Sequence, residues 1–498
     1  MKKHFHIRLE PLGKKIRVAE GTPLKDILFS YGVEFPCGGK GLCGGCRVKV
    51  LEGEVSFDAA HRAALEKLGL ADPWRLACRS MITGDVTLEI GQFETFILAD
   101  SSPFHFRPRE GYGIAFDIGT TTLVAQLINL QDGEVMAVET DVNPQARYGG
   151  DVISRIEYAV LQKGSEELTR LIREKFVMMT GKLLKKCGGT PPATILVAGN
   201  TVMHHLFCGY DLTPMASYPF ETRQGGTCRF TAEELGLPAD HTEIVFLPVL
   251  GSFVGSDILA GIVATGMAES EAPVILVDLG TNGEIVVGNR ERILCASTAA
   301  GPAFEGTNIH MGMRATTGAI SSVTLGNGEV RTHVIGNERA RGICGSGLID
   351  AIAVFLEKGD IDTGGRVTTG DERLYLTPEV YLTQKDVREL QLAKSAIASG
   401  LQILMEEMGI AAGEVKNVFI SGAFGTFISL ENTRRIGLLR FPEEKIVKMG
   451  NTALLGTKML LFEDLSVVER MLEKTRHLSL ESNPRFQDIF AENMIFEG

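Results

Sequence analysis

Three cysteines lie within ten residues near the start of the chain, in the stretch FPCGGKGLCGGC at 35–46. Cys37, Cys43 and Cys46 have the spacing C-x5-C-x2-C, and Cys78 follows in WRLACRS. Four thiolates bind either zinc or an iron–sulfur cluster, and their number alone does not decide between the two. The glycines of the loop favour a cluster, because glycine reaches positive φ without steric cost and lets backbone N–H groups wrap around bridging sulfides.

Two later segments share a second chemical pattern. IAFDIGTTTLVAQLIN at 114–129 and ILVDLGTNGEIVVGN at 275–289 each run from an apolar strand to an aspartate, an apolar residue and Gly-Thr. The aspartates, Asp117 and Asp278, would reach the edge of a cleft, where a carboxylate holds Mg²⁺ through water. The turns that follow present N–H groups and hydroxyls to phosphate oxygens. The candidate phosphate-binding residues are Gly119, Thr120, Thr121, Thr122, Gly280, Thr281, Asn282 and Gly283.

A further parallel links ILVAGNTVMHHLF at 195–207 with VFISGAFGTFISL at 418–430. In each, a buried strand ends at glycine and enters a predicted helix. Both pairs of segments are explained by an internal duplication of about 160 residues. The second member adds Gly422 and Gly425 as candidate nucleotide-binding residues.

The elements that must position these groups change in character along the chain. HIRLEP, KIRVAE, CRVKVLEGEV and DVTLEI have the alternation of short strands, and TPLKDILFSYGV that of one amphipathic helix. Residues 93–112 contain two prolines and mixed charge, which is typical of a linker. Beyond them, strands alternate with long helices. We therefore predict a first domain at 1–92, the linker at 93–112, and two α/β lobes at 113–268 and 269–498.

Composition excludes several classes of function. Of 498 residues, 44% are hydrophobic and 22% charged, which is typical of a globular protein, and the net charge of −12 argues against a nucleic-acid partner. The N-terminal segment lacks the apolar run of a signal peptide, and no apolar stretch is long enough to span a bilayer. We therefore expect a cytoplasmic protein with no membrane partner.

Each part of the chain resembles a known fold. Residues 1–92 resemble a 2Fe–2S ferredoxin of the plant or adrenodoxin type, an α+β domain with the β-grasp fold, in which the four cysteines would be the cluster ligands. The remainder resembles the acetate kinase, sugar kinase, Hsp70 and actin (ASKHA) superfamily, a two-lobed α/β ATPase made of duplicated RNase H-like halves. By that resemblance FDIGTTT and VDLGTNG are the phosphate motifs, VFISGAFGTF is the adenosine motif, and GNTALLGTKM at 450–459 is a helix connecting the lobes.

The whole chain resembles the reductive activators of corrinoid proteins. YGGDVISRIEYA at 148–159, STAAGPAFEGTNI at 297–309 and RGICGSGLIDAIA at 341–353 are similar to this family's own sequence. The resemblance implies that ATP drives one electron from a 2Fe–2S cluster to a Co(II) corrinoid, restoring the Co(I) state. It also implies Mg²⁺, a corrinoid protein as partner and an upstream low-potential electron donor. Because only the short linker precedes Asp117, we expect a short member that lacks the middle domain; a homodimer is left open.

Several single residues allow two interpretations. Glu305 in GPAFEG would position the attacking water or, equally, cap a helix. His204 and His205 in NTVMHHLF are interpreted as packing residues, and a role as cobalt ligands is the alternative. Cys344 in GICGSG is interpreted as a small packed residue at a tight turn.

Three alternative assignments accompany this interpretation. The cysteine loop has a zinc-stapled alternative. An activator of a 2-hydroxyacyl-CoA dehydratase would use the same ATPase fold, but with a 4Fe–4S cluster bridging two subunits. A nucleotide-dependent binding module would use its cluster as a redox sensor.

Overall fold

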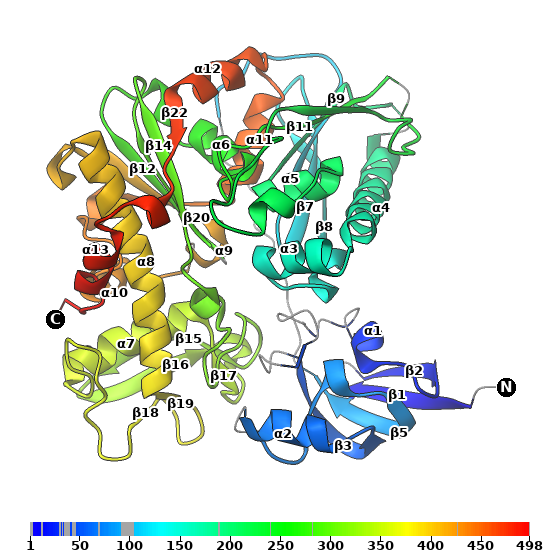
Figure 1. The fold of residues 1–498 in the computed structure, drawn as a ribbon, viewed down its shortest axis with the longest axis vertical. Coiled ribbons are helices and arrows are strands. Elements are labelled where there is room, and N and C mark those ends of the chain that lie inside the picture. The colour runs from blue at the N-terminus through cyan, green and yellow to red at the C-terminus, as the bar shows by residue number, and fades with distance from the viewer. Residues whose placement is uncertain are drawn as a thin grey trace. The chain divides into compact units, whose positions relative to one another are not determined.

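The computed structural model describes the chain except for residues 1–2, 11–12, 29–30, 32, 34–39, 42–45, 68–69, 91–103, 188–189, 240, 281, 426 and 498. The chain forms two compact units (Figure 1). The first consists of residues 1–95 with 142–172, and the second of residues 96–141 with 173–498.

The first unit contains a five-stranded sheet in the order β2-β1-β5-β3-β4. β1 pairs in parallel with β5 and antiparallel with β2, and this mixed sheet packs on a core that includes Ile7, Leu9, Val48 and Leu88. The four predicted strands and the predicted helix are all present. The elements of this sheet are β1 His4–Glu10, β2 Lys14–Ala19, α1 Leu24–Leu28, β3 Arg47–Val55, α2 Ala59–Lys67, β4 Trp74–Leu76 and β5 Ile82–Glu89.

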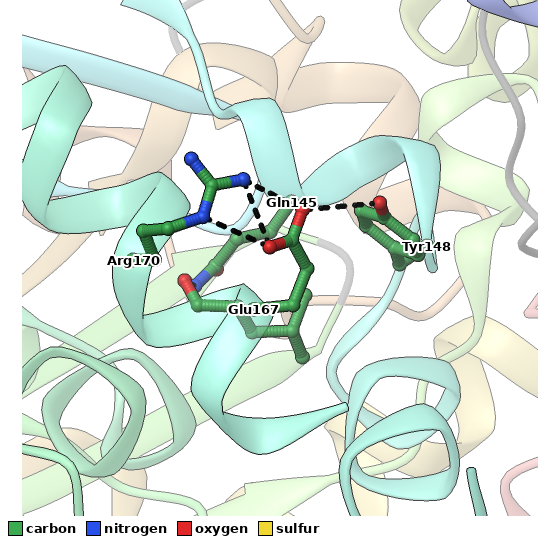
Figure 2. A network of polar contacts seen from close by, with 5 residues as sticks. Gln145, Tyr148, Glu167 and Arg170 are labelled. Atoms are coloured by element: carbon green, nitrogen blue, oxygen red, sulfur yellow. Dashed lines mark hydrogen bonds and ion pairs between the residues drawn. The ribbon is translucent and has the colours of Figure 1, made fainter. Parts of the chain in front are cut away.

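Residues 142–172 contain the family-like segment YGGDVISRIEYA and form a polar network of their own. The short helix η3 (Pro144–Arg147) contacts the start of α4 (Ser165–Leu184) where the Gln145 amide donates to the Leu168 carbonyl at 2.9 Å. Figure 2 shows Glu167 between Arg170 and Tyr148, with a 2.8 Å ion pair on one side and a 3.3 Å hydrogen bond from the Tyr148 hydroxyl on the other.

The buried Arg155 of α3 (Val152–Leu161) holds this segment together. Its guanidinium donates to the Gly149 carbonyl and to the Gln145 side chain, at 2.9 and 3.2 Å. Burial lowers the pKa of Arg155 to about 9, while the nearby Asp151 opposes that change. Asp151 also caps α3 by accepting from the Ser154 amide at 2.7 Å.

The second unit contains two six-stranded sheets that repeat one arrangement. The first has the order β10-β11-β9-β6-β7-β8, and the second β21-β20-β12-β13-β14-β22. In both, an antiparallel hairpin (β6–β7, β12–β13) lies beside a parallel strand that comes later in the chain (β9, β20). The duplication expected from the sequence is therefore present as a repeat of topology.

The strands of the first sheet are β6 Tyr112–Ile118, β7 Thr122–Asn129, β8 Val135–Val142, β9 Thr194–Gly199, β10 Cys228–Thr231 and β11 Glu243–Phe246. Those of the second are β12 Val274–Leu279, β13 Gly283–Gly288, β14 Ile293–Thr298, β20 Asn417–Ser421, β21 Ile446–Gly450 and β22 Thr475–His477. The central strands β6, β7, β9, β12 and β13 are almost entirely buried, and their near-continuous apolar sequences follow from burial on both faces.

Helices and small sheets complete the second unit. The helices are α5 Thr201–Cys208, α6 Ser256–Ala264, α7 Gly345–Lys358, α8 Gln384–Met408, α9 Gly422–Gly425, α10 Leu430–Arg435, α11 Thr452–Leu460, α12 Ser466–Lys474 and α13 Phe486–Glu492. The remaining strands are β15 Ala319–Gly326, β16 Glu329–Val334, β17 Gly342–Ile343, β18 Arg373–Tyr375 and β19 Tyr381–Thr383. In the described part of the chain, no helix is long and apolar enough to cross a bilayer.

Helices α6 and α11 cross between the two large sheets (Figure 1). Glycine makes the crossing possible: a Cβ on Gly456 of α11 would lie 1.8 Å from the Ala260 carbonyl oxygen of α6. On the other helix, a Cβ on Gly261 would lie 2.7 Å from Leu276 and 3.3 Å from the Thr452 hydroxyl. The backbones of the two halves therefore meet with no side chain between them.

We predict that Gly456→Ala lowers the free energy of unfolding by about 1–3 kcal/mol, because the new methyl group clashes with rigid backbone. Gly181→Ala in α4 is the matched control, since that helical glycine has no atom within 4 Å of the added Cβ. The control should stabilise the protein by up to about 1 kcal/mol through helix propensity. Urea unfolding followed by circular dichroism measures both; equal effects would contradict the close crossing.

Candidate functional site

The first candidate site lies where β3 and β4 meet in the ferredoxin-like sheet. Arg47 pairs with Leu76 across these strands, and the Ala77 amide donates to the Cys46 carbonyl at 2.9 Å. This pairing brings the backbone beside Cys46, which is buried, next to the turn that carries the half-buried Cys78. Cys37 and Cys43 lie outside the described residues.

Arg79 holds the cysteine loop against the segment of Cys78. Its guanidinium donates to the Lys40 carbonyl at 3.0 Å, and its side chain packs directly on Gly41. Gly41 has φ +72°, and a Cβ there would lie 2.0 Å from Arg79 Nε. The hydrogen bond from Arg79 therefore fixes Lys40 beside the segment of Cys78, and the chemistry of the four cysteines fits a thiolate-ligated cluster.

The second candidate site is formed by the two Asp-Gly-Thr turns. Asp117 lies near the end of β6, and its carboxylate accepts from the Asn451 amide of α11 at 2.9 Å. The Gly119 amide closes the turn by donating to the Thr122 carbonyl at 3.1 Å, an approach that a Cβ on Gly119 would block at 2.5 Å. The Thr120 hydroxyl accepts from Asn200, which also caps α5. Thr121 lies between Thr120 and Thr122 in the turn.

The second turn repeats the first with different partners. Asp278 accepts from the Ser421 hydroxyl of β20 at 2.5 Å, and the Gly280 amide donates to the Asn282 carbonyl at 3.1 Å. Asn282 hydrogen-bonds the Glu284 carboxylate with its side chain. Thr281 lies outside the described residues.

Glycines line the end of β20 beside this turn. Gly422 has φ +87°, and a Cβ there would lie 2.7 Å from the Leu279 carbonyl and 3.1 Å from an Asp278 oxygen. A Cβ on Gly425 would lie 2.5 Å from Ile420, and one on Gly283 would lie 2.8 Å from Thr298. These positions keep the backbone of the second half close to its aspartate.

Four carboxylates from separate elements gather around these turns, namely Asp117, Asp257, Asp278 and Glu284. Burial raises the pKa of Asp117 to about 6 and that of Asp257 to about 7, and the charge of Asp278 adds to both changes. Burial also raises the pKa of Asp278, although the Ser421 hydrogen bond opposes it. The pKa of Glu284 lies well above its usual value, because burial acts together with the charges of Asp257 and Asp278.

This cluster has the character of a site for a hydrated cation. Like charges held together in a half-buried region favour a bound cation, which relieves their repulsion. Within the described ranges, no three His, Cys, Asp or Glu side chains lie close enough to bind one metal ion together. The raised pKa values of the carboxylates are the observation that favours a cation here.

The other single residues considered in the sequence analysis lie at the following positions in the fold. Glu305 ends the short helix η7 (Pro302–Glu305) and is not among the charges that raise the pKa of the aspartates. His204 and His205 are buried and hydrogen-bond the carbonyls of Gly226 and Thr201, as expected of packing residues. Cys344 is buried at the start of α7, also as expected.

The family-like motifs of the second half meet one another through packing. Phe304 of GPAFEG stacks on Phe424 of the adenosine-like motif, with ring centroids 5.0 Å apart. A Cβ on Gly345 of GICGSG would lie 1.8 Å from the Phe304 carbonyl. These three segments therefore pack against one another, which the sequence of each segment alone does not indicate.

Sequence reasoning missed Asp257, Glu284, Asn451 and Asn200. Asp257 and Asn451 lie at the starts of α6 and α11, far along the chain from the turns that they face. Their signal in sequence is weak, because Asp and Asn are ordinary residues at a helix N-terminus. The internal duplication is the sequence feature that would have indicated α6 and α11 together, because these helices occupy corresponding places in the two halves.

Comparison with known proteins places these sites in a family. Residues 7–83 match the 2Fe-2S iron-sulfur cluster binding domain, residues 112–270 the RACo middle region, and residues 272–498 the C-terminal domain of RACo, the ASKHA domain. Corrinoid activation enzyme RamQ of Eubacterium limosum is 35% identical over 434 residues, which cover 80% of this chain and 72% of that protein. The chain belongs to the RACo family, the reductive activators of corrinoid proteins.

Further members are similar over comparable lengths. The Co(II) methylated amine-specific corrinoid protein reductase of Methanosarcina barkeri is 29% identical over 421 residues, 76% of each chain. A solved structure, the reductive activator for corrinoid,iron-sulfur protein, has 25% identity and a TM-score of 0.68, and the match covers 99% of this chain and 98% of that one. The fold expected from the sequence, a ferredoxin domain followed by an ASKHA domain, is confirmed.

One expectation is wrong. The sequence suggested a short RACo member without the middle domain, yet residues 112–270 match the RACo middle region. The expectation failed because the RACo middle region of this chain is the segment that itself carries the first Asp-Gly-Thr turn, and no separate domain precedes that turn among the matched residues. Five strands of its sheet have the same order as five strands of the C-terminal sheet.

We predict that Gly41→Ala lowers the iron and acid-labile sulfide content of the reconstituted protein several-fold, because the methyl group displaces Arg79. Gly21→Ala is the control: Gly21 also has positive φ, at +80°, but no atom lies within 4 Å of its added Cβ. The control should retain its cluster with a small loss of stability. Equal loss in both variants would attribute the effect to backbone strain alone.

We predict that Asp257→Asn stabilises the protein by about 4 kcal/mol at pH 8. Since the folded-state pKa of Asp257 is raised to about 7, the wild-type carboxylate destabilises the fold increasingly from pH 4 to pH 7 and fully above it. The advantage of the variant should therefore vanish near pH 4. Urea unfolding across this range measures it, with the exposed Asp371→Asn as control; a difference independent of pH would contradict the cause given.

Proposed function

We propose that this chain is an ATP-dependent reductive activator that passes one electron to the Co(II) corrinoid of a partner protein and restores Co(I) for methyl transfer. The observation that carries the proposal is the joint presence, in one RACo family chain, of a 2Fe–2S ferredoxin domain and of paired Asp-Gly-Thr turns with a carboxylate cluster. The chain is accordingly an enzyme, an iron–sulfur ATPase.

In this proposal Cys37, Cys43, Cys46 and Cys78 bind the cluster, with Arg79 keeping their two segments together. When bound, the cluster supplies a single electron at low potential. We infer that the glycines of the loop let the cluster lie near the surface, within reach of a docked partner. The zinc-stapled alternative loses its support, because residues 7–83 match an iron–sulfur domain.

The nucleotide site is proposed at the two turns. Asp117 and Asp278 would position Mg²⁺ and the phosphates of ATP, while Thr120, Thr121, Thr122, Thr281 and Asn282 would contact phosphate oxygens. Gly119, Gly280 and Gly283 would allow the backbone its close approach, and Gly422 and Gly425 would face the adenosine. Asp257 joins the aspartates as an outer carboxylate that holds water on the ion. Glu305 remains the proposed residue for the attacking water.

ATP is needed because the electron transfer runs uphill. Co(I) is a very strong reductant, and for one electron each 59 mV of gap is a tenfold bias, or about 1.4 kcal/mol. Free energy from nucleotide binding and hydrolysis crosses such a gap only if it changes the affinity for the corrinoid partner, which is a coupling free energy between the two sites. In this proposal, closure of the ASKHA cleft around the nucleotide is the conformational change that couples the two sites.

Further parts of the proposal are an upstream low-potential electron donor, a cytoplasmic location, the option of a homodimer, and the domain boundaries at 92/93, 112/113 and 268/269. The dehydratase-activator alternative requires a bridging 4Fe–4S cluster. An electron paramagnetic resonance spectrum of the 2Fe–2S type would argue against that alternative. A binding module would hydrolyse ATP at a rate that is indifferent to cluster reduction.

We predict that Asp278→Asn abolishes ATP-dependent formation of Co(I), followed by visible absorbance of an added corrinoid protein under anaerobic conditions. Dithionite reduction of the cluster should be unchanged in this variant, because the aspartate belongs to the second unit. Cys78→Ser should give the reverse pattern, with ATP binding intact and the cluster lost. Co(I) formation by wild-type protein without ATP at an equal rate would overturn the proposal.

A further inference from the structure

Two half-buried cysteines of the second unit face each other outside both sites described above. Cys208 is the last residue of α5, and Cys228 is the first residue of β10. The Cys208 thiol donates a hydrogen bond to the Cys228 sulfur, so the two sulfur atoms are in direct contact range. They come from segments about 20 residues apart and meet through tertiary packing, not through a local motif.

Aromatic packing fixes the positions of these two cysteines. β10 pairs with β11 so that Cys228 lies opposite Phe246. Phe207, the neighbour of Cys208, packs against Phe246 and Phe230 with ring centroids 5.4 and 5.6 Å apart. The end of α5 and the start of β10 are thus held by one set of rings, which keeps the two cysteines beside each other.

The surroundings of the pair are electropositive and polar. The Tyr210 hydroxyl donates to the Cys228 sulfur at 3.5 Å, and the Arg173 side chain donates to the Phe207 carbonyl at 2.7 Å. The hydrogen bond from Cys208 lowers the pKa of Cys228, against the effect of burial, and Tyr210 and Arg173 lower it further. The same bond raises the pKa of Cys208, which keeps its proton as the donor.

The two thiols are therefore distinct in role. Cys228 is the one whose thiolate is stabilised, and the thiolate is the reactive form of cysteine. Cys208 is the protonated neighbour placed to react next. Other described cysteines lack these features: burial raises the pKa of Cys295 to about 12, and Cys344 is buried at the start of α7.

We propose that Cys228 and Cys208 form a peroxide-reactive dithiol, with Cys228 as the attacking and Cys208 as the resolving residue. The Cys228 thiolate attacks one oxygen of hydrogen peroxide, the O–O bond breaks, and sulfenic acid and hydroxide form. The Cys208 thiol then condenses with the sulfenic acid, forming the S–S bond and releasing water. In total the two thiols lose two electrons and two protons, and one peroxide becomes two waters.

This chemistry links to the proposed function only through the supply of oxidant. A low-potential centre that meets oxygen generates peroxide, so a dithiol in the same chain would be exposed to it whenever anaerobic conditions fail. The reactivity of the pair itself depends on the packing and hydrogen bonds of the second unit. A failure of corrinoid activation would leave it untouched, and the test below involves neither ATP nor a corrinoid.

The test treats the reduced full-length protein with a small excess of hydrogen peroxide, alkylates remaining thiols and maps disulfides after trypsin. Cys228 falls in peptide 224–229, and Cys208 in peptide 187–223, which also contains Cys187. We expect these two peptides to become linked, and dithiothreitol to release them. Cys187→Ser is the matched control and should keep the link, whereas Cys208→Ser should lose it.

The order of attack is tested with dimedone, which traps sulfenic acid. Cys208→Ser should accumulate the adduct on Cys228, and Cys228→Ser should show about tenfold less adduct on Cys208, because its thiol stays protonated. Circular dichroism verifies that the variants fold. Absence of the 187–223 to 224–229 link in wild type, its persistence in Cys208→Ser, or equal adducts in the two variants would each overturn the proposal.

Discussion

The hydrogen bond from Asn451 to Asp117 is the contact on which the second unit depends. It joins two residues 334 positions apart and brings the start of α11, in the second half, onto the first strand of the other half. Asn451 can reach because α11 crosses α6 at Gly456 with bare backbone between them. Without that crossing, the two Asp-Gly-Thr turns would have no fixed relation to each other.

The two halves repeat one topology, but their polar partners differ. Asp117 receives a neutral donor from the helix of the opposite half, whereas Asp278 receives a hydroxyl from its own half, at Ser421. The helix that corresponds to α11 is α6, which has Gly255 as its N-cap and the acidic Asp257 in its first turn, and the charge of Asp278 raises the pKa of Asp257. Acidic side chains therefore gather on the side of Asp278, whereas Asp117 has the neutral Asn451 as its donor.

The sequence predicted the parts of this arrangement that are local. The apolar strands, the aspartates near their ends and the glycine turns are contiguous, and each is present in the structure. Asp257, Asn451 and the Arg79–Gly41 contact escaped prediction because each depends on a tertiary approach between distant segments. The expected absence of the middle region was wrong for a related reason: the middle region itself carries the first turn, so the short distance from the ferredoxin domain to that turn did not indicate a missing domain.

The carboxylate cluster also suggests why an activator needs its nucleotide to change state. In the ligand-free chain the repulsion among Asp117, Asp257 and Asp278 is only partly offset by the donors around them. A cation and nucleotide that relieve it bind one arrangement of the halves better than another, and only such differential affinity shifts a conformational equilibrium. A site whose charges were fully compensated would bind ATP equally well in both arrangements of the halves and would shift no conformational equilibrium. On this reasoning, the repulsion within the carboxylate cluster would contribute to the coupling that we propose between nucleotide and corrinoid partner.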